Sequence, residues 1–267
     1  MRILPLLLLA ALASPAPALG EMFAEAIPAR IGLTLAHGDS ARRELAVANH
    51  GTEPIAVRVR YSDWTMDARG ARTLLKPGRA VASLDGLVAC EPSSFVVGPG
   101  DTGRVTVTLR MPNYGPATRW GVLLSEVRPA VAPDVSGGGA ALGTTIYLSS
   151  LPPGDIRPEI DAIDVAPLGP DSLRVHVRVK NRGGRHFHAG AEVTIRDLDG
   201  TTIHSGRLPV AVVLPEFARE ATFECRVRLP AGRYLAAVAL DAGLPHRLEA
   251  EVAFKWPPAP SAGLAKP

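Results

Sequence analysis

The chain has 267 residues, of which 46% are hydrophobic, 21% charged and only 5% aromatic, and its formal net charge is +3. This length is sufficient for two domains, each with a core of its own. The basic residues are scattered instead of forming a stripe interleaved with aromatic residues, which argues against a nucleic-acid-binding protein. The 26 glycines and 25 prolines, together with abundant valine and threonine, favour an all-β fold.

Residues 1–20 have the pattern of a cleaved secretory signal peptide. Arg2 supplies a positive charge, residues 3–13 are apolar, and small residues at 16–20 offer cleavage sites. The apolar stretch is too short to span a bilayer, although an uncleaved anchor is the alternative. We therefore expect an exported, periplasmic protein without a membrane span after cleavage; a location at the cell surface or outside the cell is also open.

Short stretches of alternating apolar and polar residues follow, separated by turn residues. They predict strands at 30–35, 42–49, 55–63, 87–89, 94–97, 104–110, 120–128 and 144–150. Residues 66–86 are polar and predicted to be irregular. Gly98-Pro99-Gly100 joins two of the strands as a turn, which predicts an antiparallel pair. Strands that follow one another this closely over roughly 120 residues have the spacing of a β-sandwich.

A Pro- and Gly-rich segment at 152–158 cannot continue a central strand, so we place a linker there. Residues 21–151 then form a first domain and residues 159–256 a second, followed by a Pro/Ala tail at 257–267. The second domain has predicted strands at 160–166, 173–180, 191–197, 202–204, 221–228, 233–240 and 247–254. A strand that ends in Asn-x-Gly occurs in both halves, at Asn49 and at Asn181, which suits two related modules.

Few residues have a spacing that indicates chemistry. His186 and His188 share one face of an extended segment, but no third metal ligand accompanies them. Gly38-Asp39-Ser40 lies between two strands, where a turn is favoured over an esterase motif. Trp120 begins an apolar strand and is expected in the core, with a ligand platform as the alternative. We therefore expect no enzyme, no cofactor and no metal.

Carboxylates near the linker and the two cysteines leave alternatives open. Asp161 and Asp164 lie close in sequence to Asp155 and Glu159, which permits a calcium site at the junction or a solvated strand edge. Cys90 and Cys225 are the only cysteines. They fall in different predicted domains, so we favour two separate thiols over a disulfide.

The order of these elements resembles the N-terminal domain of the periplasmic pilus (fimbrial) assembly chaperones. The matching segments are Leu45-Ala-Val-Ala-Asn49, residues 55–64, Pro92 to Gly98-Pro99-Gly100, residues 120–129 and residues 144–152. This resemblance implies two tandem immunoglobulin-like β-sandwiches. The family caps exported pilin subunits by lending its final strand of the first domain to them, and two basic residues hold the subunit's terminal carboxylate.

These functional positions carry over only in part. The basic positions align with Leu33 and Tyr147, although Arg30 is nearby as a candidate anchor. The stretch that should supply bulky donor side chains reads Gly137-Gly138-Gly139-Ala140-Ala141-Leu142. Leu142, Ile146 and Leu148 share one face, so we predict that they contact the partner, along a free edge at 144–150. Tyr147 faces the other way and is expected to pack within the protein.

Three hypotheses follow. The first is a chaperone-like protein that binds exported envelope or pilin-like subunits by β-strand pairing. The second is a structural or adhesive tandem-sandwich module without chaperone activity, because the basic pair is missing and the glycines weaken the donor strand. The third, a hydrolase or metalloenzyme, rests only on the weak motifs above. The oligomeric state is not predicted.

Overall fold

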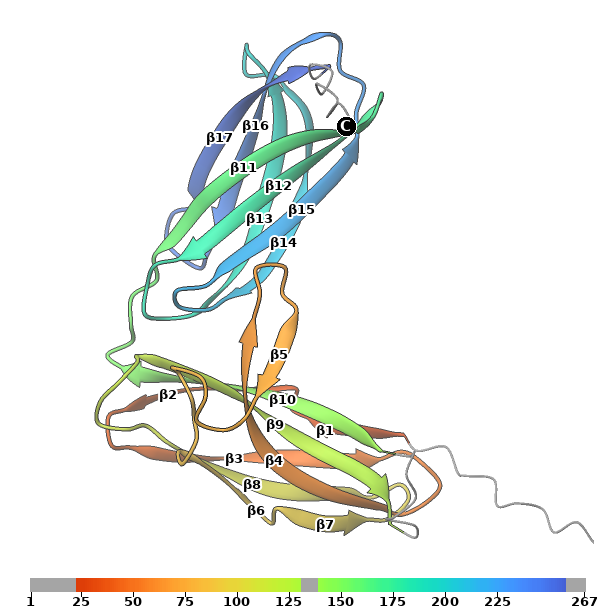
Figure 1. Ribbon diagram of the computed structural model, residues 1–267, viewed down its shortest axis with the longest axis vertical. Helices are drawn as coiled ribbons and strands as arrows, with labels where there is room; N and C mark the ends of the chain where they lie inside the picture. Colours follow the sequence, from red (N-terminus) through yellow and green to blue (C-terminus); the bar gives the residue numbers. More distant parts are fainter. Residues whose placement is uncertain (1–22, 131–138, 258–267) are drawn as a thin grey trace, which may run out of the picture.

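The computed structural model describes residues 23–130 and 139–257, and all regular elements in these ranges are strands. Four sheets form two immunoglobulin-like β-sandwiches that follow one another along the chain (Figure 1). No helix among the described residues is long and apolar enough to cross a membrane. The predicted signal peptide lies outside the described residues.

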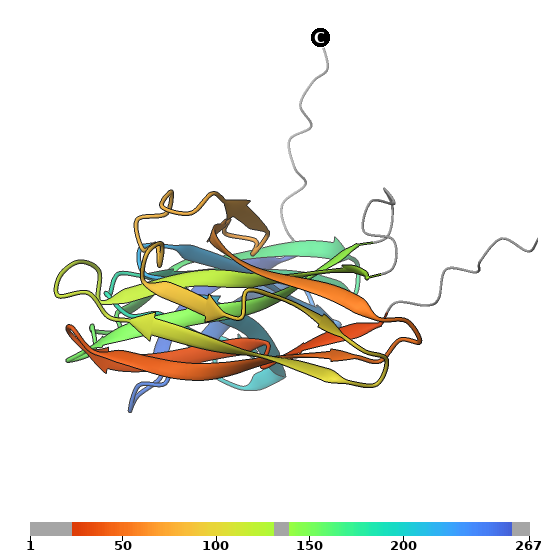
Figure 2. The same cartoon turned by 90° about the horizontal axis from the view of Figure 1, so that it is seen from below.

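The first sandwich consists of two facing sheets (Figure 2). One sheet has the order β1-β3-β8-β6, formed by β1 (Ala24–Ile27), β3 (Ser40–Asn49), β8 (Thr102–Arg110) and β6 (Val88–Glu91). The other has the order β2-β10-β9-β4-β5, with β7 beside β4; its strands are β2 (Arg30–Ala36), β10 (Ala140–Leu151), β9 (Thr118–Pro129), β4 (Ile55–Met66), β5 (Arg72–Leu75) and β7 (Ser94–Val97).

Alternation along the strands builds the core between these sheets. Val105, Val107 and Leu109 of β8 are fully buried, as their spacing predicts. Ile146 and Leu148 of β10 face them from the other sheet and belong to the same apolar cluster. Burial of these aliphatic side chains supplies the main stabilisation of the sandwich.

Two predictions about pairing and regularity are wrong. β7 and β8, joined by the Gly98-Pro99-Gly100 turn, do not pair with each other: β7 pairs with β4, and β8 pairs with β3 and β6. The turn therefore connects the two sheets across the core. Within the segment predicted to be irregular, β5 pairs antiparallel with the end of β4. The N-terminal strand β1 also lacks a counterpart in the prediction.

The second sandwich also has two sheets. One has the order β11-β12-β15, from β11 (Pro158–Gly169), β12 (Ser172–Asn181) and β15 (Ala218–Arg226). The other has the order β14-β13-β16-β17, from β14 (Thr202–Val213), β13 (Phe187–Asp197), β16 (Gly232–Asp241) and β17 (Leu248–Trp256). Gly200, with a φ of 86°, lies in the turn between β13 and β14, where a positive φ suits glycine.

The Asn-x-Gly repeat has the same structure in both sandwiches. The Asn49 side-chain amide donates to the carbonyl oxygens of Glu53, Val97 and Gly98, and its Oδ1 accepts from Gly51 N–H. The Asn181 amide likewise donates to two carbonyl oxygens, and its Oδ1 accepts from the N–H two residues later. Both side chains are buried, so each asparagine satisfies backbone groups at one end of its sandwich.

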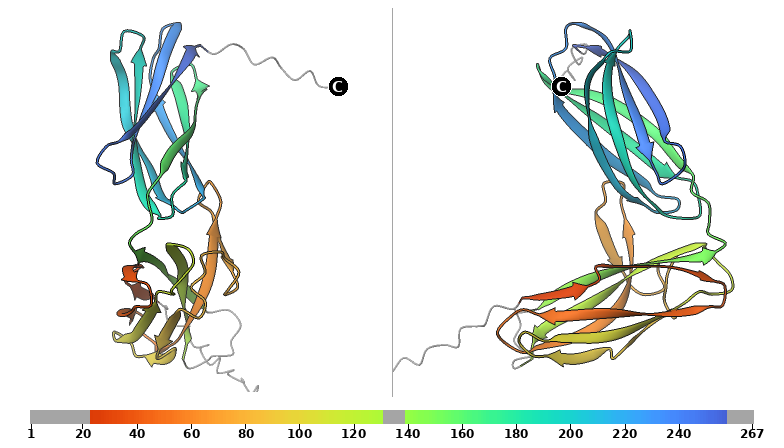
Figure 3. Two further views of the ribbon diagram at one scale, coloured as in Figure 1. Left: turned by 90° about the vertical axis from the view of Figure 1, so that its left-hand side faces the viewer. Right: turned by 180° about the vertical axis from the view of Figure 1, so that it is seen from behind.

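The two sandwiches contact each other directly. The β4–β5 hairpin rises from the first sandwich to the second (Figure 3), where Glu220 N–H donates to the Ala68 carbonyl oxygen at 2.7 Å. An apolar cluster also spans the junction and includes Trp64, Trp120 and Tyr147 from the first sandwich and Leu214 from the second. These contacts fix the angle between the sandwiches.

Candidate functional site

β10 has a partner on both sides along most of its length. It pairs with β9 over residues 140–149 and, in parallel, with β2 from Thr145 to Leu151. The predicted free edge at 144–150 is therefore wrong. β2 covers it because the chain crosses from one sheet to the other between β1 and β2, a long-range pairing that the local sequence pattern does not reveal.

An open edge remains at residues 140–144. Among the described residues, no strand pairs with this part of β10 on the side away from β9. Thr145 N–H donates toward β2, to Ala29, whereas Ser150 N–H donates toward β9, to Ala117. Backbone groups alternate along a strand, so the N–H and C=O groups of Ala141 and Gly143 face the open edge.

The three side chains predicted to contact a partner differ in their surroundings. Ile146 and Leu148 are 0% exposed and lie in the core of the first sandwich. They therefore have no surface to offer a partner while the sandwich is folded. Leu142 is half-buried and packs at the margin of the same core. Gly139 is described and exposed, whereas Gly137 and Gly138 lie outside the described residues.

Tyr147 packs within the protein, as predicted. It is 3% exposed, and its ring stacks on His186 of the second sandwich with a centroid distance of 4.4 Å. Trp64 contacts the same ring edge-on. The second sandwich thus covers the position at which the resemblance implies a basic anchor.

Arg30 lies on the same face of the sheet as Tyr147. Its register partner on β10 is Thr145, and Gly32 is the residue opposite Tyr147, so the aligned Leu33 points into the core instead. Arg30 Nη1 donates to His188 Nε2 at 2.8 Å. Among the described residues, it has no carboxylate partner, which leaves its charge available to an anionic group.

Arg72 is a further cation near Tyr147, and the sequence pattern alone does not reveal it. Its guanidinium lies over the Trp64 ring, 5.2 Å from the centroid. Burial raises the pKa of Tyr147, and the charges of Arg72 and Arg30 oppose that shift. The only signal in the sequence was a basic residue within a segment predicted to be irregular, so its position beside Tyr147 follows from the β4–β5 pairing.

The His186 and His188 pair belongs to the junction between the sandwiches. No group of three or more metal-binding side chains occurs within residues 23–130 and 139–257. Burial lowers the pKa of His186 to about 4, and the charges of His188, Arg185 and Arg30 act in the same direction. His186 is therefore a neutral contact residue at neutral pH.

This buried histidine predicts a loss of stability in acid. An unfolded His186 binds a proton below its ordinary pKa of 6.5, whereas the folded one does so only near 4. Stability should therefore be fully present above pH 6.5 and fall as the pH drops from 6.5 to 4, by about 3 kcal/mol. His186→Phe keeps a ring against Tyr147 and should remove this part of the pH dependence. Urea unfolding at pH 7.5 and 4.5 measures it; an equal acid loss in both proteins would refute the assignment.

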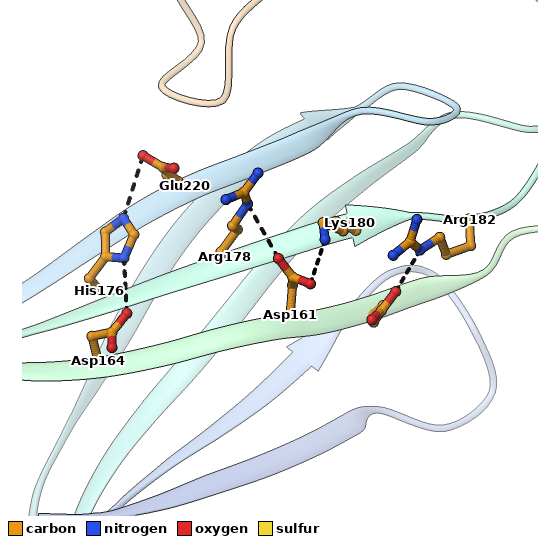
Figure 4. A network of polar contacts seen from close by, with 8 residues as sticks. Asp161, Asp164, His176, Arg178, Lys180, Arg182 and Glu220 are labelled. Carbon is orange, nitrogen blue, oxygen red and sulfur yellow. Dashed lines mark hydrogen bonds and ion pairs between the residues drawn. The ribbon is translucent and has the colours of Figure 1, made fainter.

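The carboxylates near the linker lie against basic side chains of β12 (Figure 4). Asp161 pairs with Lys180 at 2.6 Å and with Arg178 at 3.4 Å, and the Lys180 hydrogen bond lowers the pKa of Asp161. Asp164 faces His176 at 3.8 Å. Since Lys180 and Arg178 of β12 pair with Asp161, and Asp164 lies exposed beside His176, the observations favour a solvated strand edge.

The remaining motifs have structural positions. Gly38-Asp39-Ser40 joins β2 to β3, and Gly38 has a φ of 84°, which a turn requires. Cys90 lies in the first sandwich and Cys225 in the second, and both are free thiols. Burial raises the pKa of the Cys90 thiol to about 11, which suppresses its reactivity.

Comparisons with solved structures find fimbrial chaperones. The class 5 fimbriae chaperone CfaA is 11% identical, with a TM-score of 0.46, and the match covers 89% of this chain and 100% of that chain. The E. coli chaperone DraB is 13% identical, with a TM-score of 0.43 and coverage of 86% and 97%. A chain from the complex of the Salmonella enterica SafA pilin with the SafB chaperone is 11% identical, with a TM-score of 0.41 and coverage of 89% and 98%.

Neither a model of a protein family nor a curated protein sequence matches this chain. The matches to fimbrial chaperones extend over most of this chain, at identities of 11% and 13% for the first two.

Proposed function

We propose that the protein is a non-enzymatic, chaperone-like periplasmic protein that binds an extended segment of an exported envelope or pilin-like subunit. The observation that carries this proposal is the open edge of β10 at residues 140–144, which precede the segment of β10 that pairs with β2. A strand edge with unpaired N–H and C=O groups is a template for an incoming strand.

The open edge is long enough for a short added strand. Ala141 and Gly143 supply the outward backbone groups, so a partner strand gains about two pairs of ladder hydrogen bonds with them. Leu142 lies on the core side at the open margin of the sandwich. Apolar side chains of the incoming strand would pack beside it and extend the core.

Arg30 is the proposed anchor for an anionic group of the partner. Arg30 is exposed, and the hydrogen bond of its guanidinium within the described residues is to the ring of His188. A carboxylate there would form a charge-assisted hydrogen bond, which at an exposed position contributes up to about 1 kcal/mol. Arg72, beside Trp64, adds positive potential near Tyr147, where the charge of Arg30 also acts.

The structural or adhesive module is the second candidate. The stacking of His186 on Tyr147 favours this candidate. The second sandwich lies against Tyr147 and leaves less room there for a client. This candidate predicts that changes at residues 140–144 leave partner binding unaffected.

Ala141→Pro tests the proposal. Proline removes the N–H that faces the open edge but leaves the N–H groups of Leu142 and Thr144, which face β9, in place. We expect Ala141→Pro to reduce pull-down of exported envelope proteins at least about tenfold, the loss of roughly one net hydrogen bond plus a steric block.

Ala141→Val is the matched control, since it keeps the N–H and has a high β propensity. It should bind as the unchanged protein does. Equal capture by the proline and valine variants would favour the structural module.

A further inference from the structure

A cavity of about 580 Å³ lies at the junction of the two sandwiches, away from the β10 edge. Its walls are mostly apolar and include Trp64, Trp120, Val81 and Pro116 from the first sandwich and Phe217 from the second. This volume is within the range of small-molecule sites, about 300–1,000 Å³. The cavity shares no residue with positions 140–144.

Two residues that line the cavity each have a buried polar atom without a partner. Trp64 Nε1 and Thr118 Oγ1 form no hydrogen bond within the described residues, although these residues are only 2% and 1% exposed. Both residues line the cavity. A buried donor without an acceptor is unfavourable, and a small shift of either side chain would bring its polar atom to an acceptor oxygen of an occupant.

The charges at the cavity favour an anionic occupant. Arg79, Arg182 and Glu216 line it. Arg182 Nε pairs with Glu159 at 2.7 Å, and this hydrogen bond, with the nearby charge of Glu216, raises the pKa of Arg182. The Arg79 side chain, in contrast, is exposed and has no ion-pair partner among the described residues. Glu216 likewise has no ion-pair partner among the described residues, but the two arginines of the lining outnumber it, and Arg79 is the unpaired one of the two.

The loop that presents Arg79 is rigidly held. The Arg79 and Ala80 N–H groups donate to Asp63 Oδ2 at 2.7 and 2.9 Å, and Asp63 is 0% exposed. The Leu84 N–H donates to the Tyr61 hydroxyl at 2.7 Å. A wall fixed by buried hydrogen bonds is preorganised, which reduces the entropic cost of binding.

We infer that this cavity binds a small apolar monocarboxylate, with its aliphatic or aromatic body between Trp64, Trp120 and Phe217 and its carboxylate toward Arg79. The carboxylate supplies both the negative charge and the acceptor oxygens. The site is independent of the proposed strand addition, because neither uses the residues of the other.

Tryptophan fluorescence provides the test. Trp64 and Trp120 line the cavity, whereas Trp256 lies in the core of the second sandwich. A bromine-labelled dodecanoate below its micelle concentration should quench the two cavity tryptophans saturably. Unlabelled dodecanoate should reverse the quenching, and dodecyltrimethylammonium, which has the same chain with a positive head, should not.

Arg79→Glu should weaken binding at least about tenfold, because it replaces the attractive charge with a repulsive one. Arg110→Glu is the control, as Arg110 is an exposed residue of β8 that does not line the cavity. Circular dichroism shows that both variants are folded before titration. Absence of saturable quenching, equal competition by the cationic amphiphile, or equal weakening by the two variants would overturn the inference.

Discussion

Replacing Ile146 by aspartate is expected to unfold the first sandwich. The side chain is 0% exposed and belongs to the core between the two sheets. Aspartate would remove its apolar contacts and leave a carboxylate without a partner in that core. We expect a loss of more than about 4 kcal/mol in the free energy of unfolding, measured by urea denaturation with circular dichroism.

Leu142→Asp is the comparison, because Leu142 lies on the same face of β10 but at the open margin. Its carboxylate can reach water, so the loss should be about 1 kcal/mol. A folded Ile146→Asp protein with unchanged stability would contradict the placement of Ile146 in the core. Loss of partner binding in this variant alone would not locate the binding surface, since the fold itself is lost.

Asp63→Ala should be the second most damaging substitution. The buried carboxylate accepts hydrogen bonds from two backbone N–H groups, of Arg79 and Ala80, and from the Tyr61 hydroxyl. Alanine would leave all three donors without their acceptor. Because hydrogen bonds to charged groups are strong, we expect a loss of about 3–5 kcal/mol in stability.

Asp67→Ala provides the control for this substitution. The Asp67 carboxylate accepts from the Ala71 N–H at 2.8 Å in the exposed turn of the β4–β5 hairpin. Water can replace that acceptor, so the loss should stay below about 1 kcal/mol. Thermal unfolding of the two variants compares them. If Asp63→Ala and Asp67→Ala lose equal stability, the loop is not held by the buried carboxylate.

Features that depend on local pattern could be predicted from the sequence. Alternation located most strands of both sandwiches, and the buried valines of β8 followed from their spacing. The Asn49 and Asn181 turns followed from a repeat of only a few residues, because each asparagine acts on backbone groups close to it as well as on a neighbouring strand.

Features that depend on long-range pairing could not be predicted. The strands β7 and β8 are adjacent in sequence but belong to opposite sheets, and no residue of the turn between them encodes that difference. The parallel pairing of β2 with β10 closes most of the predicted edge, although the two strands are separated by about a hundred residues of sequence.

The candidate site shows the same division. The alternation of side chains along β10 correctly placed Tyr147 and Ile146 on opposite faces of the strand. Alternation alone cannot show which face is turned to the core and which to a partner. Arg72 and Arg79 come from the segment predicted to be irregular. Their positions at the junction depend on the β4–β5 hairpin and on the buried Asp63, which only the three-dimensional structure reveals.

Hydrogen exchange at the backbone amides of Ala141 and Gly143 tests the central claim most directly. These N–H groups face the open edge, so they should exchange rapidly in the isolated protein, whereas the amides of Leu142 and Thr144, which face β9, should exchange slowly. In complex with an envelope subunit captured by the protein, the account predicts strong protection at Ala141 and Gly143 and little change at Leu142 and Thr144. A complex in which Ala141 and Gly143 still exchange as fast as in the free protein would contradict strand addition at this edge.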